Sequence, residues 1–110
     1  MNVTIKRGDT RTAVKATLKD AQGQAVNLTD CTVRFLMSKK GATTLIVDKG
    51  AIIHDAINGV VWYVFDAVDV AESGTMRAEF EVTYPDKRTE TFPNSGYITV
   101  HIEPDLNREG

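Results

Sequence analysis

The sequence predicts an all-β domain of antiparallel strands, arranged as a β-sandwich or a small barrel. Residues 74–84 alternate between apolar and polar side chains, with Met76, Phe80 and Val82 on the apolar side. Because side chains alternate with a period of two only in a strand, one face of this segment lies against a core and the other faces water. About eight such segments recur at intervals of roughly ten residues between turn signals, which is typical of sandwiches and barrels. Long helical patterns do not separate them, which disfavours a parallel α/β sheet.

The first half of the chain contains alternating segments separated by turn-forming residues. Strands are expected at residues 2–6, 12–19 and 32–39, and β-rich segments at residues 43–48 and 51–55. Residues 20–24 form a turn, because they combine an Asp that hydrogen-bonds locally with a Gly that tolerates a positive φ. In residues 32–39, Val33, Phe35 and Met37 share one face, so this segment is expected to be a strong strand with a buried side.

The second half begins at Asn58-Gly59, which is a tight-turn signal. Strands are expected at residues 60–66, 74–84, 89–92 and 97–103. Residues 67–73 have weak helical spacing, so one helical turn or a loop crossing between sheets is expected there. The sequence therefore predicts a single β-sandwich domain over residues 1–104, followed by a loose polar tail over residues 105–110.

Composition excludes several classes of protein. The chain has 110 residues, a net charge of -2 and one cysteine, Cys31, so no intramolecular disulfide forms. An acidic pI near 5.6 and the lack of a basic stripe with aromatic residues argue against nucleic acid as a partner. No apolar run reaches membrane-spanning length and no signal peptide is recognisable. We therefore expect neither nucleic acid nor membrane as a partner.

Charge is unevenly distributed along the chain. Residues 1–40 carry eight basic and three acidic residues, whereas residues 41–110 carry five basic and twelve acidic ones. One interpretation is chance variation of a solvated surface. The alternative is a molecule that docks head-to-tail through a basic and an acidic patch. Because strands fold back on each other, the two halves of the sequence need not become two halves in space.

The segment at residues 60–65 is apolar on both faces, with Val61, Tyr63 and Phe65 alternating with the second set. That second set consists of Val60, Trp62 and Val64. Either a loop or a barrel interior covers it, or it is a partner-binding surface with Trp62 as the anchor, since Trp is favoured at the centres of interfaces. This is the strongest binding-site hypothesis that the residues supply.

Arg7-Gly8-Asp9 is a second candidate for partner binding. An exposed loop tip there presents opposite charges, in the tripeptide that integrins recognise. The simpler interpretation is a break between two strands that contains Gly and Asp, because short motifs recur by chance and need a structural context.

The remaining reactive side chains do not form a recognisable site. Asp66, Asp69 and Glu72 lack the density of a calcium loop, so they are expected to solvate a crossover and cap a helical turn. The residues His54, His101 and Cys31 lack the paired spacing of zinc motifs and form no nucleophile–base pair. We therefore expect no metal, no cofactor and no catalytic residue. An enzyme would instead need a pocket that gathers Asp66, Asp69, His54 or His101.

Several segments occur in a familiar order: residues 5–10 (IKRGDT), 20–29 (DAQGQAVNLT), 33–37 (VRFLM), 59–65 (GVVWYVF) and 73–80 (SGTMRAEF). Their order and spacing resemble the N-terminal domain of phage baseplate upper proteins, from Val3 to Pro104. The resemblance implies an immunoglobulin-like antiparallel β-sandwich of about seven or eight strands. It also implies a non-enzymatic docking module in the tail or baseplate of a phage or prophage virion, made in the bacterial cytoplasm.

The partners that this resemblance implies are other phage tail or baseplate proteins, and self-association is a further expectation. The contacts expected are the Val60, Trp62 and Val64 face, the loop of Arg7 and Asp9, and exposed strand edges. Because the sequence ends at Gly110 without a downstream arm, the docking role is expected rather than receptor binding. The alternative is a carbohydrate- or cell-surface-binding module, which would need an exposed aromatic platform from Trp62, Tyr84 and Tyr97.

Overall fold

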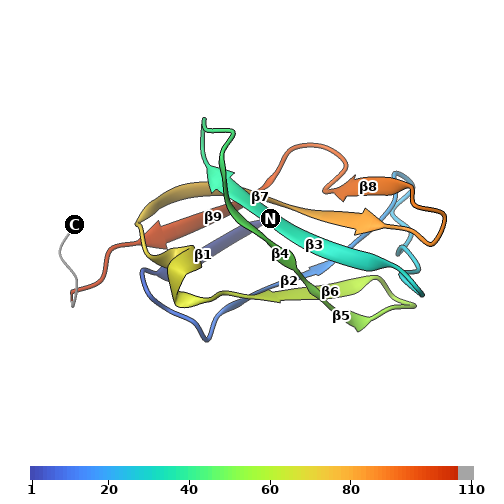
Figure 1. The fold of residues 1–110 in the computed structure, drawn as a ribbon, viewed down its shortest axis with the longest axis horizontal. Helices are drawn as coiled ribbons and strands as arrows, with labels where there is room; N and C mark the ends of the chain where they lie inside the picture. Colours follow the sequence, from blue (N-terminus) through green and yellow to red (C-terminus); the bar gives the residue numbers. More distant parts are fainter. Residues whose placement is uncertain (107–110) are drawn as a thin grey trace.

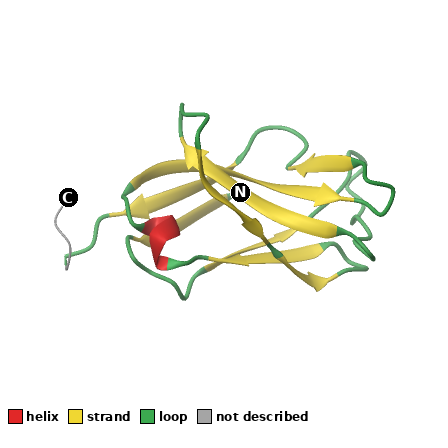
Figure 2. Ribbon diagram, viewed as in Figure 1, coloured by secondary structure: helices red, strands yellow, loops and turns green. Residues whose placement is uncertain are grey.

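Two β-sheets pack face to face in the computed structural model, which describes residues 1–106 (Figures 1 and 2). This part of the chain forms β1 (Asn2–Lys6), β2 (Ala13–Thr17), β3 (Thr32–Lys39), β4 (Leu45–Gly50), β5 (Ile52–Asp55), β6 (Val60–Val64), a 3-10 helix η1 (Ala67–Val70), β7 (Gly74–Thr83), β8 (Thr89–Phe92) and β9 (Ile98–Glu103). The predicted all-β sandwich is confirmed, and the helical turn expected between β6 and β7 is η1. No helix in the described residues is long and apolar enough to cross a membrane.

The larger sheet, sheet A, has six strands in the order β1-β9-β7-β3-β4, and β8 also pairs with β7. β9 pairs with the first half of β7 and β8 with the second half, so both lie on the same side of that strand. The smaller sheet, sheet B, has the order β2-β6-β5. The chain passes between the sheets after β1, β2, β4 and β6. In sheet B, β6 lies between β2 and β5 and is the central strand.

All strand pairs in the described residues are antiparallel except one. β1 and β9 pair in parallel, from Asn2 opposite Thr99 to Lys6 opposite Glu103. This departs from the predicted purely antiparallel arrangement. Alternation of side chains does not specify strand direction, and no hairpin connects these two strands to impose an antiparallel pairing.

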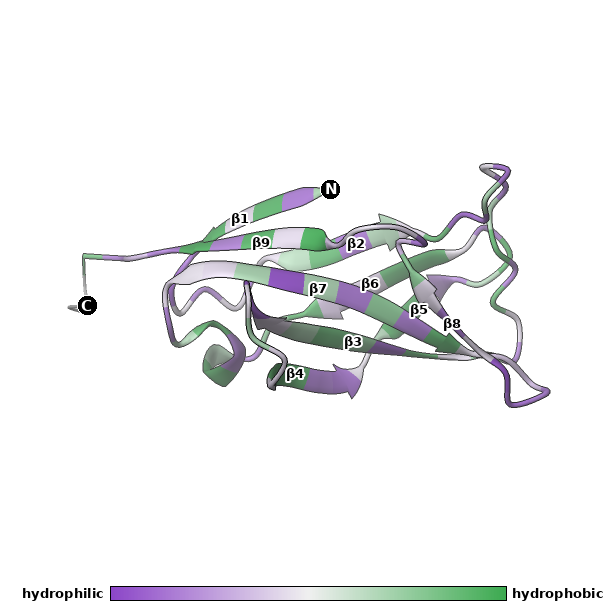
Figure 3. Ribbon diagram, turned by 90° about the horizontal axis from the view of Figure 1, so that it is seen from above, coloured by the Kyte–Doolittle hydropathy of each residue, from purple (hydrophilic) through white to green (hydrophobic). Residues whose placement is uncertain are grey.

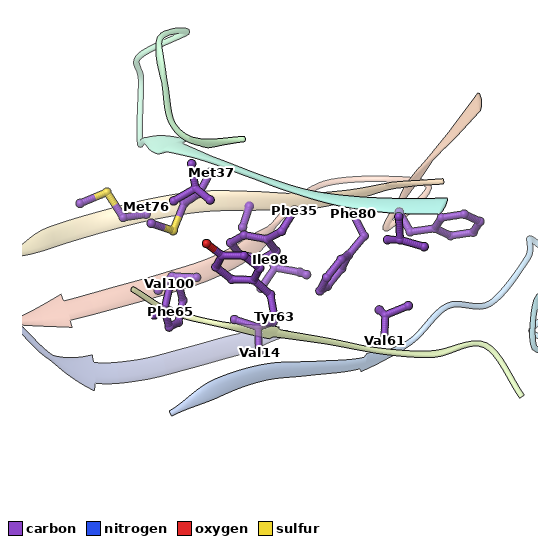
Figure 4. Close-up of a cluster of buried hydrophobic side chains, with 14 of the residues drawn as sticks. Val14, Phe35, Met37, Val61, Tyr63, Phe65, Met76, Phe80, Ile98 and Val100 are labelled. Atoms are coloured by element: carbon purple, nitrogen blue, oxygen red, sulfur yellow. The ribbon is translucent and has the colours of Figure 1, made fainter. Parts of the chain in front are cut away.

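The core lies between the sheets and centres on Phe35 (Figure 4). The Phe35 ring, from sheet A, stacks on the Tyr63 ring of sheet B, with centroids 4.4 Å apart. Phe65 and Phe80 contact it edge-on at 6.0 and 5.2 Å. Fully buried side chains around this cluster include Val14, Met37, Val61, Met76, Val82 and Val100. The aromatic cluster therefore joins the two sheets.

β7 has the faces that its alternation predicts (Figure 3). Met76, Ala78, Phe80 and Val82 are all buried, whereas the residues between them are partly exposed. The apolar side of β7 thus lies against sheet B, and its polar side forms the outer surface of sheet A.

Gly59, in the predicted tight turn, has a φ of 70° and lies against two neighbouring backbone segments. A Cβ at this position would lie 2.8 Å from the carbonyl oxygens of Leu18 and Val26. We expect Gly59→Ala to lower the free energy of unfolding by about 2 kcal/mol, because a left-handed conformation and a backbone clash are both imposed. Urea denaturation measures the change.

Gly41→Ala is the matched control for Gly59→Ala. Gly41 has a φ of 85°, but no atom lies within 4 Å of its added Cβ. The control is expected to lose only about 1 kcal/mol, from the left-handed conformation. Equal losses in the two variants would contradict a role for the close approach at Gly59.

Candidate partner-binding surfaces

The outer surface of sheet B carries the apolar set found at residues 60–64. β6 places Val60, Trp62 and Val64 on this side, while Val61 and Tyr63 point into the core. The neighbouring strands add further outward side chains, since Lys15 on β2 and Ile52 on β5 both pair opposite Trp62. We refer to the outward side chains of Lys15, Ile52, His54, Val60, Trp62 and Val64 as the Trp62 face.

The Trp62 face is open to solvent at its apolar margins. Val64 is 45% exposed and Ile52 is 53% exposed, whereas Val60 and Trp62 are partly buried. The face lies on the outside of a two-layer sandwich, so it is not a barrel interior. The exposure of Val64 and Ile52 also shows that no described loop covers those two side chains.

The Trp62 ring is held between two side chains. The His54 imidazole stacks on it with centroids 3.9 Å apart and an interplanar angle of 11°. The Lys15 ammonium lies 4.4 Å from the ring centroid, in cation–π geometry. The two groups come from strands on opposite sides of β6. Their contacts orient the Trp62 ring before any partner binds.

Arg7 does not lie at an exposed loop tip, so the partner-binding interpretation of Arg7-Gly8-Asp9 is wrong for this residue. Its side chain is only 7% exposed and forms an ion pair of 3.1 Å with Asp105, and its backbone N–H donates to the Glu103 carbonyl. Asp9 is exposed. Burial makes Arg7 part of the anchor between the end of β1 and the end of β9, so the exposed charges of this loop are Asp9 and Arg11.

The same ion pair bears on the expected tail at residues 105–110. Asp105 is partly buried against Arg7, so this residue is attached to the domain. Leu106 is fully exposed. Residues 107–110 of the expected tail lie outside the described residues.

Asp69 is a buried carboxylate that the sequence did not single out as structural. It lies on η1, is 3% exposed, and accepts three hydrogen bonds. The Tyr63 hydroxyl and the Asp66 N–H donate to Oδ2 at 2.6 and 2.9 Å, and the Lys49 ammonium donates to Oδ1 at 2.9 Å. The carboxylate thus connects sheet B through Tyr63, the crossover, and sheet A through Lys49. The expected solvating role fits Asp66, which is exposed, and is wrong for Asp69, whereas the expected capping of a helical turn is confirmed because Asp69 accepts the Asp66 N–H at the start of η1.

This network shifts the pKa values of its members. Burial raises the pKa of the Asp69 carboxyl, but hydrogen bonds from Tyr63, Lys49 and the Asp66 N–H outweigh burial, so the pKa is lowered. Burial and the hydrogen bond to Asp69 raise the pKa of the Tyr63 hydroxyl. The Lys49 pKa is raised by its hydrogen bonds to Asp69 and Asp66. All three groups are therefore held in their ordinary charge states at neutral pH. A signal for this arrangement existed in the sequence, because Tyr63 was expected in the core and a buried hydroxyl needs a partner.

The other reactive side chains lie apart. Cys31 is buried, with a pKa raised by burial and by Asp30, and its Sγ lies 3.7 Å from the Thr29 carbonyl. His101 lies 3.4 Å from the Thr75 hydroxyl on sheet A, whereas His54 is on sheet B. Across residues 1–106 no cluster of three or more His, Cys, Asp or Glu side chains could hold a metal ion.

The hollows of the described surface do not gather acids and histidines. One of about 260 Å³ lies between the free edge of β2 and the β8–β9 connection, and its lining is largely apolar. Of the five hollows found over residues 1–106, His101 lines two and Asp69 lines another, and none is lined by two members of the set Asp66, Asp69, His54 and His101. Two acids, Asp69 and Glu72, line the same hollow beside η1, and neither histidine reaches it.

Comparison with protein families gives one match, a family model described as the BppU N-terminal domain, over residues 1–109. No curated protein matches the chain. The resemblance to baseplate upper proteins seen in the sequence is thereby confirmed.

Two solved structures share the fold. The N-terminal domain of phage TP901-1 ORF48 superposes with a TM-score of 0.63 and 19% identity, covering 96% of this chain and 85% of that one. CopC from Methylosinus trichosporium OB3b superposes with a TM-score of 0.55 and 17% identity, and the match covers 98% of this chain and 89% of the CopC chain. At such identities these similarities concern the fold alone.

Proposed function

Because the chain belongs to the family of the BppU N-terminal domain, the baseplate upper protein domain of phages, we propose that it is a docking module that binds neighbouring tail or baseplate proteins of a phage or prophage. The observation that carries the proposal is the family match across residues 1–109. A structural module of this kind resides in the virion tail. Its work in this proposal is binding to neighbouring virion proteins.

The Trp62 face is the contact surface we propose. Interface hot spots are enriched in Trp and are surrounded by contacts that exclude water. Here Trp62 is partly buried between His54 and Lys15, so little side-chain freedom remains to be lost when a partner binds. Ile52 and Val64 provide exposed apolar area on either side of it. The free edges of β2 and β5 border the face and offer unpaired backbone groups for an added strand.

The ring stack also bears on the carbohydrate alternative. A sugar stacks on the open face of an aromatic ring, through the negative potential of that face. The Trp62 ring already stacks on His54 and contacts the Lys15 ammonium, so a sugar would have to compete with these contacts. Tyr84 is partly buried and its hydroxyl donates to Glu90 at 2.7 Å, while Tyr97 lies on the other sheet. The three aromatic residues therefore do not form one platform, which favours protein docking over sugar binding.

We expect Trp62→Ala to weaken binding to a baseplate protein of the same phage by roughly 30-fold, which corresponds to about 2 kcal/mol for a central hot spot. Titration of the immobilised baseplate protein with wild-type and variant chains measures the dissociation constants. A urea midpoint close to that of the wild type shows that the variant is folded.

Val68→Ala is the control for this experiment, because Val68 is 70% exposed on η1 and lies outside the Trp62 face. Its dissociation constant is expected to equal that of the wild type. Equal affinities for Trp62→Ala and the wild type would remove the Trp62 face from the proposal. A glycan array that bound the wild type but not Trp62→Ala would favour the carbohydrate alternative.

A further inference from the structure

The outer surface of sheet A carries two groups of charges separated along β7. At one end, Lys40 and Arg77 line a hollow of about 250 Å³, together with Thr75, Tyr97, Thr99 and His101. At the other end, Glu79 and Glu81 project from the same side of β7 as Arg77, because side chains two residues apart share a face. We refer to this surface as the β7 face. It lies on the opposite side of the sandwich from the Trp62 face.

The cations of the β7 face have no carboxylate partner in the described part of the chain. Neither Lys40 nor Arg77 forms an ion pair there, whereas Lys39 pairs with Glu72 and Arg34 pairs with Asp48. The Arg77 guanidinium instead lies 5.1 Å from the centroid of the Tyr97 ring, which is 49% exposed. This contact orients the guanidinium on the surface of the sheet, and Arg and Tyr are both enriched at interface hot spots.

The two carboxylates form no ion pair within residues 1–106, although Arg34 of β3 lies opposite Glu81 and pairs with Asp48 instead. The Cα atoms of Glu79 and Glu81 are about 7 Å apart, two residues along a strand. Burial and the neighbouring Glu81 charge raise the pKa of Glu79, so the ionised form of this group is destabilised in the single chain. A cation supplied from outside would relieve that repulsion.

We propose that the β7 face binds the β7 face of a second copy of this chain. The two-fold axis lies in the plane of the interface, perpendicular to β7, and crosses β7 between Arg77 and Glu79. A rotation of 180° about this axis brings Arg77 of each copy opposite Glu79 of the other. The same rotation places Thr75 of each copy over Glu81 of the other. The contact is self-complementary, as a two-fold dimer requires, and each charge pair forms twice.

The size of the surface is sufficient for such a dimer. The strands of sheet A have 39 residues, and each residue covers about 16 Å² of the sheet, which gives roughly 600 Å² per copy. This area is at the low end of the range for specific interfaces, about 600–1,000 Å² per partner. Because the contact is mostly polar, the dimer is expected to dissociate in salt, where charges are screened over about 3 Å at 1 M. The inference goes beyond the proposed function, since the Trp62 face stays free in the dimer.

Charge reversal tests the proposal. Sedimentation equilibrium of the full chain at low salt is expected to show a mass that rises towards that of a dimer with concentration. Arg77→Glu and the double variant Glu79→Lys/Glu81→Lys are each expected to be monomeric, because like charges then meet across the axis. An equimolar mixture of the two variants is expected to form a heterodimer tighter than the wild-type dimer, since one face is then acidic and the other basic. Arg11→Glu, at an exposed residue outside this face, is the control and is expected to dimerise like the wild type.

Three results would overturn the proposal. The first is a wild-type chain that stays monomeric at all concentrations at low salt. The second is a mixture of the two charge-reversed variants that stays monomeric although both are folded. The third is a monomer whose Arg77→Glu variant loses affinity for a baseplate protein, which would assign the β7 face to a different partner. A monomer that still binds the baseplate through Trp62 overturns this inference and leaves the proposed function standing.

Discussion

Phe35→Ala is expected to lower the free energy of unfolding by about 4 kcal/mol, in the range measured for deletion of buried aromatic rings. Phe35 is fully buried and contacts three aromatic rings from both sheets. Removing its ring leaves a cavity at the point where the sheets meet. Domains of this size are stable by about 5–15 kcal/mol, so the variant retains only a fraction of the original stability. Urea denaturation at neutral pH, monitored by Trp fluorescence and by circular dichroism, measures the loss.

Two further variants make this experiment specific. Phe35→Leu keeps most of the volume and is expected to lose about 1–2 kcal/mol. Val68→Ala removes two methyl groups from a side chain that is 70% exposed and is expected to change stability by less than about 0.5 kcal/mol. If Phe35→Ala fell within 1 kcal/mol of the wild type, the aromatic cluster would not be the centre of the core.

Asp69→Ala is expected to lower the free energy of unfolding by about 3 kcal/mol. The change removes the acceptor of the Tyr63 hydroxyl and of the Asp66 N–H, and it leaves the buried hydroxyl without this partner. An unsatisfied buried group costs about 1–3 kcal/mol, and breaking a buried charge network costs about 3–5 kcal/mol. Urea denaturation of Asp69→Ala, Tyr63→Phe and the double variant measures the coupling between the two groups. Strictly additive effects would show that the hydrogen bond of 2.6 Å between them does not contribute.

The Asp69 carboxylate makes the stability of the folded chain depend on pH. The pKa of Asp69 is lower in the folded chain than its ordinary value, because the hydrogen bonds to the carboxylate outweigh burial. A lowered pKa contributes stability that is fully present above the unfolded value of about 4 and is lost as the pH falls through the folded value. We therefore expect wild-type stability to decrease below about pH 4, and we expect a shallower decrease in Asp69→Asn. Equal slopes in the two proteins would show that Asp69 does not titrate with unfolding.

Local alternation was sufficient to predict the strands and the side that each one buries. Met76, Phe80 and Val82 were expected on one face of β7, and all three are buried. The crossover after β6 was also expected, and η1 forms there. These features were predictable because a strand has a fixed period, so the apolar pattern along a few residues already states which side meets the core.

The environment of the charged residues was not predictable in the same way. Arg7 was expected at a loop contact and Asp69 at a solvated crossover, yet both are buried. Arg7 pairs with Asp105, which is 98 residues away in sequence. Asp69 is buried because Tyr63 and Lys49 reach it from different sheets. A charged side chain is buried only where partners compensate for its lost hydration, and those partners come from other parts of the fold.

The sequence by itself determined the class of the fold, the strands, their buried faces and the family to which the chain belongs. Only the tertiary structure decided the parallel pairing of β1 with β9, the burial of Arg7 and Asp69, and the stacking of His54 and Lys15 on Trp62. The physical reason is the range of the interactions. Strand periodicity acts between neighbouring residues, whereas pairing direction, ion pairs and ring stacking depend on segments that meet only when the two sheets have packed.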